Sequence, residues 1–327
     1  MSNPRKPPRR HHYIPRFYLE GFCAPASAKS NGKQLFWVYE KGHEPRCSVP
    51  EAEAYQRDFY SFDENGMKNV QTERWFAGLE TRIAPLITDL IRTKREPTEA
   101  ERTCLAVFLG TMCTRTPLGR RLSDERFGPA TSEMLKRVAA DPIEFRELYA
   151  SMDARFRERE DEETIEQVRQ DILSGKSDAL EERDDFRLAS IIEVGITVSE
   201  VLFEMGWRFI YAPEGHRFIT SDNPLVTEVS EPGSKAIHFR SGVNVPNAGA
   251  WFPLTQNAVL MMQKSLPSGV MTVSGLLARE INKRVMICAE RRIYAGEHSL
   301  RLQNAFDKHG CKVPVESLDL RYEGQPI

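Results

Sequence analysis

Two stretches of the sequence combine side chains that carry acid–base chemistry. The first is residues 11–15, His-His-Tyr-Ile-Pro, and the second is residues 221–224, Ser-Asp-Asn-Pro. An imidazole titrates near neutral pH, so it can transfer protons or bind a metal as the neutral ring. Adjacent side chains point in different directions on most backbones, so only one of His11 and His12 is expected to enter any given site. The alternative is that the dipeptide is an ordinary polar start of the fold.

The second stretch directly follows a strongly apolar strand. Asp222 and Asn223 are residue types that close turns by bonding their own backbone, and Asn-Pro disfavours helical geometry at the asparagine. A plain turn is therefore one interpretation of these residues. The other is that the end of a strand holds the Asp222 carboxylate rigidly in an active site.

A buried arginine and two glutamates are further candidates. Arg115 shares a helix face with the apolar residues Phe108 and Met112, and a guanidinium there must be paired or must bind an anion. Glu73 and Glu80 lie seven residues apart, on the same side of a predicted helix. They could hold a metal, act as acid and base, or pair with Arg115; the alternative is two partly solvated glutamates at a helix edge.

Several well-known catalytic signatures are absent from the sequence. It contains no G-x-x-x-x-G-K-[ST] phosphate loop, no G-x-G-x-x-G after a strand, no H-E-x-x-H and no G-x-S-x-G. This disfavours NTPases with that phosphate loop, dinucleotide oxidoreductases, zincin proteases and ordinary α/β-hydrolases.

Composition indicates a globular protein. The 327 residues are 40% hydrophobic and 28% charged, with a net charge of −2. This balance excludes a generally basic surface, but residues 5–16 form a local basic patch that contains four arginines and one lysine. We predict that residues 1–9 are a basic disordered tail. No apolar run reaches the ~20 residues of a membrane span, no signal peptide is recognised and the six cysteines are scattered, so we expect a cytoplasmic protein in a reducing compartment.

The order of elements favours an α+β fold. We expect a central, mostly antiparallel sheet packed against long helices, in a single domain of residues 10–327. Helices are predicted over 70–94, from a capping box at Thr98 to Pro117, over 185–205 and from residue 274; strands are predicted over 34–39, 236–239, 251–254 and 258–262, with a hairpin over 207–220. Residues 118–183 are predicted to be a charged helical insertion, which is either a solvated face or an arm that binds a protein partner.

The motifs together resemble an uncharacterised family, DUF4238. The resemblance rests on residues 11–22 (HHYIPRFYLEGF) and 218–224 (FITSDNP), supported by Arg115-Thr116-Pro117, residues 252–254 (FPL) and Asn282. The family implies no established activity. It does imply that separated polar motifs share one site, which would contain His11, His12, Arg115, Asp222 and Asn223.

The leading hypothesis is a phosphodiester hydrolase that cleaves RNA or DNA. His12 or His11 would be the general base or a metal ligand, Asp222 a metal ligand or the group that orients the histidine, and Arg115 would stabilise phosphate charge. Ser221, Asn223 and Arg16 would bind the substrate. Glu80 and Glu73 would supply oxygen ligands for Mg²⁺ or Mn²⁺, whereas Zn²⁺ would suit a histidine.

Two other functions are compatible with the same residues. In one, the polar groups form a structural network in a non-enzymatic module, and the insertion binds a protein partner. In the other, the constellation binds a nucleotide or another small anion. A bacterial defence or toxin role is suggested by the family resemblance and not by any residue.

Overall fold

The fold is described from a computed structural model. It describes residues 9–24, 33–60, 62–64, 67–156, 161–174, 184–230, 237–239 and 243–312. The predicted basic tail, residues 1–9, lies outside the described residues except for Arg9. The structure confirms the α+β class.

The largest element is a six-stranded sheet. All neighbouring strands are antiparallel except β13 and β7, which are parallel. This confirms the prediction of a mostly antiparallel sheet. In spatial order the strands are β10 (Ile237–Phe239), β9 (Val226–Ser230), β11 (Ala248–Thr255), β12 (Ala258–Gln263), β7 (Gly206–Tyr211) and β13 (Gly269–Thr272).

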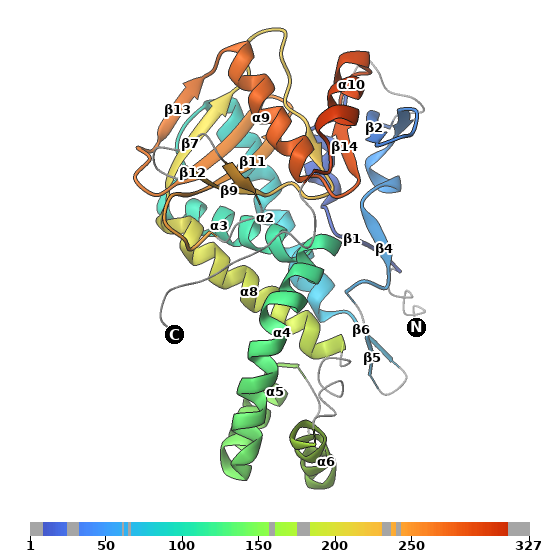
Figure 1. The fold of residues 1–327 in the computed structure, drawn as a ribbon, viewed down its shortest axis with the longest axis vertical. Helices are drawn as coiled ribbons and strands as arrows, with labels where there is room; N and C mark the ends of the chain where they lie inside the picture. The colour runs from blue at the N-terminus through green and yellow to red at the C-terminus, as the bar shows by residue number, and fades with distance from the viewer. Residues whose placement is uncertain are drawn as a thin grey trace, which may run out of the picture.

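Helices cover both faces of this sheet (Figure 1). Alternate residues of a strand point to opposite faces. Phe209 and Leu260 join a core with three long helices, whereas Ile210 and Val259 join a core formed mainly with a single helix, together with Phe306. Because each buried side chain of this size contributes about 2 kcal/mol, the two cores hold the layers together. The three helices are α2 (Gln71–Thr93), α3 (Glu99–Thr114) and α8 (Asp184–Glu204), and the single helix is α9 (Gly275–Cys288).

A second, four-stranded sheet lies beside the first. Its antiparallel order is β3 (Arg46–Ser48), β2 (Phe36–Glu40), β14 (Arg292–Ala295) and β8 (Thr220–Ser221). The hairpin predicted over residues 207–220 is wrong, because β7 pairs with β12 and β13, while β8 pairs with β14 in the other sheet. The amide of Phe218 bonds the carbonyl of Gln256 and that of Ile219 bonds Asn282. The chain between β7 and β8 thus crosses from one sheet to the other.

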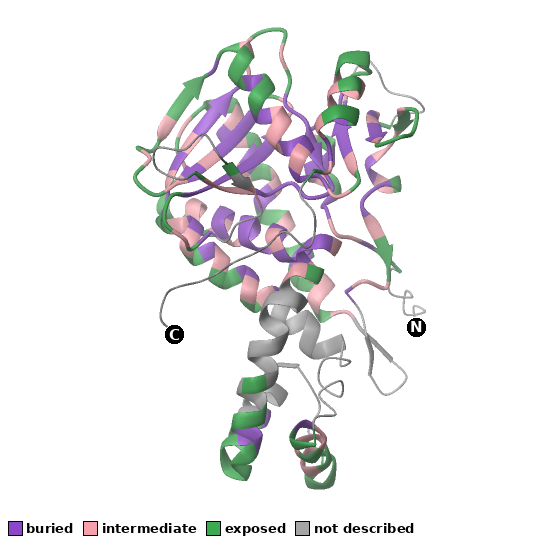
Figure 2. Ribbon diagram, in the orientation of Figure 1, coloured by how far each residue is buried: buried purple, intermediate pink, exposed green. Residues whose placement is uncertain are grey.

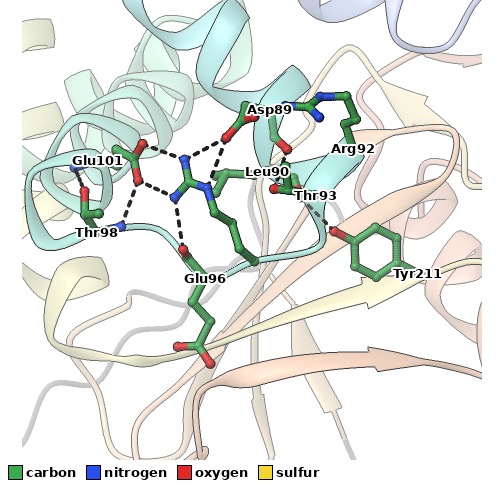
Figure 3. Close-up of polar contacts among 9 residues, drawn as sticks. Asp89, Leu90, Arg92, Thr93, Glu96, Thr98, Glu101 and Tyr211 are labelled. Carbon is green, nitrogen blue, oxygen red and sulfur yellow. Dashed lines mark hydrogen bonds and ion pairs between the residues drawn. The ribbon is translucent and has the colours of Figure 1, made fainter.

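The corner between α2 and α3 confirms the predicted capping box (Figure 3). The Thr98 hydroxyl accepts from the Glu101 amide, and the Glu101 carboxylate accepts from the Thr98 amide. Arg95 donates to both Asp89 and Glu101. Its hydrogen bond to Glu101 is the largest of the causes that lower the pKa of Glu101 to about 2. The Tyr211 hydroxyl donates to the carbonyl of Leu90, which fixes the corner against the sheet.

The end of α3 differs from the prediction in one respect. Pro117 does not simply terminate that helix; it is the first residue of α4 (Pro117–Ala140), and the Thr116 side chain caps the new helix. Proline suits this position, because the first amides of a helix have no partner within it. The helix break between them leaves Arg115 and Thr116 buried.

The predicted insertion forms helices that extend away from the sheets (Figure 1). They are α4, α5 (Pro142–Phe156) and α6 (Glu162–Leu173). Their far ends carry a small core of their own, made of Val138, Ala139, Phe145, Tyr149 and Ile172. Around it the surface is largely exposed (Figure 2). None of the helices in the described residues is long and apolar enough to cross a membrane.

Short elements complete the fold. Near the N-terminus, β1 (Arg10–His12) pairs with β4 (Tyr55–Arg57), and β5 (Phe62–Glu64) pairs with β6 (Met67–Asn69). The remaining helices are α1 (Arg16–Glu20), the 3-10 helix η2 (Pro50–Ala52) and α10 (Leu300–His309). The β1–β4 ribbon carries both predicted histidines, in strand β1.

Candidate active site

The β1–β4 ribbon separates the two histidines. His11 pairs with Gln56 and His12 pairs with Tyr55 in the antiparallel register. Since successive residues of a strand point to opposite faces, His11 is buried against α2, whereas His12 is half-buried on the other side. The two rings therefore belong to different environments.

The His11 imidazole is held at both nitrogens. Nδ1 accepts a hydrogen bond of 2.8 Å from the Tyr60 amide, and Nε2 lies 3.2 Å from Oε2 of Glu73. The ring stacks on that of Tyr60, with centroids 5.9 Å apart and planes within 5°. An Nδ1 that accepts leaves the proton on Nε2, facing the Glu73 carboxylate. His11 is thus fixed in one tautomer inside the fold.

Arg115 lies in the same buried region. Its Nη1 atom is 2.9 Å from Oε1 of Glu80, and its Nη2 donates to the carbonyl of His12 at 2.9 Å. The guanidinium carbon lies 4.2 Å from the centroid of the Phe76 ring, a cation–π contact. The Tyr60 hydroxyl donates to the Arg115 carbonyl. We call His11, Tyr60, Glu73, Glu80 and Arg115 the inner cluster.

The two glutamates of the inner cluster therefore each face a different protein group. Glu73 faces His11 and Glu80 faces Arg115, so the structure contains the pairing of Arg115 that was one of three alternatives. Among the described residues, no three His, Cys, Asp or Glu side chains are grouped so that they could hold a metal ion. Of the two predicted metal ligands, Glu80 is the ion-pair partner of Arg115 in this structure, and Glu73 lies beside Nε2 of His11.

His12 has a different environment. One ring nitrogen bonds the backbone of Glu51, while Nε2 is shielded from solvent and has no hydrogen-bond partner in the part of the chain that the structure describes. Burial is the main cause that lowers the pKa of His12, and the nearby positive charges of Arg16 and Arg115 lower it further. Arg16 is half-exposed, and its Nη2 lies 3.1 Å from Glu51. His12 is therefore a neutral imidazole near cations, and its shielded Nε2 has no hydrogen-bond partner among the described residues.

The Asp222 carboxylate is occupied by backbone groups. It accepts hydrogen bonds from the amides of Glu290, Arg291 and Arg292, at 2.8, 2.8 and 3.0 Å. Burial raises the pKa of Asp222 to about 7, although these amides favour the charged form. Asp222 thus fixes the loop between α9 and β14.

The neighbours of Asp222 serve the same loop. The Ser221 hydroxyl donates to the Asn223 carbonyl and accepts from its amide, and the Asn223 side chain donates to the carbonyl of Cys288 at the end of α9. The sequence allowed a turn or an active-site carboxylate here. The observed contacts are those of a turn that ties a strand end to a helix end.

A buried polar group that sequence reasoning missed lies between these regions. Glu53 is 2% exposed and accepts from Arg46 and from Ser48, and it lies 3.6 Å from Arg292. The Tyr294 hydroxyl is fully buried and has no hydrogen-bond partner among the described residues. Burial raises its pKa well above the usual value, and Tyr13, Asp222 and Glu53 raise it further.

No short-range pattern marks this group in the sequence. Glu53 lies in a polar stretch of the sequence, and Tyr294 follows the apolar Ile293 without any motif around it. The one sequence signal for this region was Tyr13, because it belongs to the first motif. In the structure, burial and the Asp222 carboxylate raise the pKa of Tyr13. The N-terminal segment thus joins two regions: His11 and the backbone of His12 contact the inner cluster, while Tyr13 lies near Asp222.

The structure is thus that of an α+β protein whose short N-terminal segment contacts the long helices through His11 and lies near the turn at residues 221–223 through Tyr13. A family model described as a protein of unknown function, DUF4238, matches residues 10–299. This match begins at the first residue of β1 and ends just before α10. The chain belongs to the DUF4238 family. No curated protein and no solved structure matches it.

Proposed function

We propose that this protein is a phosphodiester hydrolase that cleaves RNA, with His12 as the general base. The observation that carries the proposal is the state of His12: its ring is oriented by the Glu51 backbone, and its Nε2 has no partner among the described residues. A general base must have a free lone pair and must be neutral at the working pH. His11 fits this role less well, because both of its nitrogens are engaged.

In the proposed reaction, His12 acts as the base and Arg16 as the cation that faces the phosphate. Nε2 takes the proton of a ribose 2′-hydroxyl, the 2′-oxygen forms a bond to phosphorus, and the bond from phosphorus to the 5′-oxygen breaks. The departing oxygen takes a proton from water, and the imidazolium returns its proton to the resulting hydroxide. The products are a 2′,3′-cyclic phosphate and a 5′-hydroxyl. Arg16, half-exposed beside His12, supplies positive charge for the phosphate.

This proposal requires a side-chain movement. Nε2 is shielded in the structure, and the Tyr55 ring lies against His12 with centroids 5.7 Å apart. Tyr55 is itself half-buried, so the movement we propose is a displacement of this ring away from the imidazole.

The test is a cleavage assay on single-stranded RNA with the purified chain. His12→Ala is expected to lower the rate by about 10²- to 10⁴-fold, the usual contribution of a general base, while leaving the melting temperature close to wild type. The matched control is His309→Ala in α10, because His309 also has a lowered pKa. Cleavage that is unchanged in His12→Ala, or equal cleavage of DNA, which has no 2′-hydroxyl, would falsify the mechanism.

A second candidate is the non-enzymatic module. It is favoured by the complete engagement of the Asp222 carboxylate with backbone amides and by the burial of Arg115 against Glu80. In that case the exposed insertion helices contact a protein partner, and the wild-type chain cleaves no RNA. Asp222→Ala and Arg115→Ala then lower the melting temperature and change nothing else, so the same assay separates the two functions.

A further inference from the structure

The β1–β4 ribbon has an exposed face whose composition is unusual for this protein. In an antiparallel pair, residues directly opposite each other share a face. The register pairs Arg10 with Arg57 and His12 with Tyr55, so these four side chains lie on the face opposite His11. We call them the outer face. Contacts agree with this placement, since the Arg10 guanidinium lies over the Tyr55 ring at 4.9 Å.

The outer face is positively charged. Arg10 and Arg57 are exposed, and two further arginines extend the charge at the ends of the ribbon. Arg9 is 59% exposed beside Asp58, and Arg16 is 51% exposed beside Glu51. Four arginines thus face two carboxylates, in a chain whose net charge is −2. A concentrated positive charge on an otherwise slightly acidic protein attracts a polyanion to this location.

The aromatic ring selects the kind of polyanion. Single-stranded nucleic acids bind where a basic track runs beside aromatic side chains, because phosphates pair with the cations while unstacked bases stack on the rings. The bases of a duplex are already stacked and do not offer their faces to Tyr55. Arginine also stacks on planar groups, and Arg10 does so on Tyr55, so a basic and an aromatic group lie in contact on this face.

We propose that the outer face is the binding track for single-stranded RNA, with phosphates on Arg10, Arg57 and Arg16 and a base stacked against Tyr55. This assignment rests on the proposed function, because it places the bound strand next to His12. A base that stacks with Tyr55 also moves this ring, which is the displacement that exposes Nε2. Substrate binding and exposure of the general base, His12, are then one event.

Binding can be measured without cleavage. The probe is a fluorescent single-stranded RNA of roughly 12 nucleotides whose 2′-hydroxyls are methylated, followed by anisotropy over a series of salt concentrations. Tyr55→Ala and the double variant Arg10→Ala/Arg57→Ala are each expected to weaken binding about tenfold or more. The double variant should also flatten the salt dependence by about 1.4 in slope, since each lost phosphate contact removes about 0.7 for a single strand.

Three controls make the result decisive. Tyr55→Phe keeps the ring and should bind like wild type, which excludes a mere folding defect of Tyr55→Ala. Arg279→Ala removes an exposed arginine of α9 and should change little. His12→Ala should lose cleavage but keep binding.

The outcomes distinguish the two proposals. Cleavage that depends on His12, combined with binding that is unaffected by all outer-face substitutions, overturns the track and leaves the hydrolase standing. Binding that depends on Tyr55 and the arginines without any cleavage supports the track and overturns the hydrolase. Equal affinity for a duplex of the same length, or for an acidic peptide, overturns the assignment to single-stranded RNA.

Discussion

The inner cluster and the outer face lie on opposite sides of the three-residue strand β1, and their side chains are in opposite environments. On the inner side, His11 and Arg115 are almost completely buried and are bound to Glu73 and Glu80. On the outer side, His12 is half-buried, its Nε2 has no partner within the described part of the chain, and its charged neighbours are largely exposed. The two adjacent histidines thus lie in opposite environments, and we propose a structural role for His11 and a chemical role for His12.

This difference follows from strand geometry. Any ribbon that covers a protein surface turns one residue inward and the next outward. The inward histidine must satisfy both nitrogens, because an unpaired buried polar atom costs about 1–3 kcal/mol. The outward histidine is only half-buried, but its Nε2 is shielded and has no partner among the described residues, so the structure carries part of this cost there and the ring must stay neutral. The lowered pKa of His12, caused mainly by burial and then by Arg16, favours that state.

The largest predicted effect concerns the inner cluster. Arg115→Ala leaves Glu80 without its cation and the His12 carbonyl without its donor, so it should destabilise the protein by about 3–5 kcal/mol. The measurement is equilibrium unfolding in urea. The control is Arg92→Ala, because Arg92 is 71% exposed beside Asp89 and such a pair contributes about 0–1 kcal/mol.

A double variant sharpens this prediction. If Arg115 and Glu80 stabilise the fold as a pair, Glu80→Ala combined with Arg115→Ala should cost less than the sum of the two single changes. Strict additivity would show that Arg115 acts through the Phe76 ring and the His12 carbonyl rather than through Glu80.

The sequence allowed much of this comparison to be predicted. The spacing of Arg115 from Phe108 and Met112 placed a guanidinium in an apolar core, and the seven-residue spacing of Glu73 and Glu80 placed both carboxylates on one helix side. Local rules sufficed because both statements concern a single helix. The capping box at Thr98 was predictable for the same reason, since its partners lie three residues apart.

Contacts between distant segments were not predictable in this way. The Asp222 carboxylate bonds amides 68–70 residues away, and nothing in the Ser-Asp-Asn-Pro motif specifies those partners. Residues 216–220 have the composition of a hairpin strand, but β8 pairs with β14. The pairing partner of this segment depends on the core that buries Phe218 and Ile219, which lies far away in the sequence. Glu53 and Tyr294 were missed because their environment exists only after both sheets have formed.

A smaller effect distinguishes the two histidines directly. His11→Ala removes the acceptor of the buried Tyr60 amide and the partner of Glu73, and should cost about 2–3 kcal/mol. His12→Ala removes one bond to the Glu51 backbone from a half-buried site, and should cost about 1 kcal/mol. Unfolding curves of the two variants, recorded side by side at neutral pH, give the comparison. If His12→Ala proved the more destabilising change, the assignment of structural and chemical roles to the two faces would be reversed.

The smallest effect is the contribution of His12 to the pH dependence of stability. Its folded pKa lies below the ordinary value of about 6.5, so on acidification the unfolded chain takes up the proton first. This lowers the free energy of unfolding as the pH falls through about 6.5 and until the folded pKa is reached, with a slope of at most about 1.4 kcal/mol per pH unit.

Asp222 acts in the opposite sense. Its raised pKa, about 7, means that the folded state holds the extra proton, so its contribution to stability is lost as the pH rises towards 7. The raw pH profile of the wild type therefore mixes two trends. The difference between wild type and His12→Gln cancels the Asp222 contribution, because both proteins contain that carboxylate. The free energy of unfolding of the wild type, minus that of His12→Gln, should decrease as the pH falls below about 6.5. A flat difference would mean that His12 is protonated as easily in the fold as in the unfolded chain, and its role as a neutral base would then have to be abandoned.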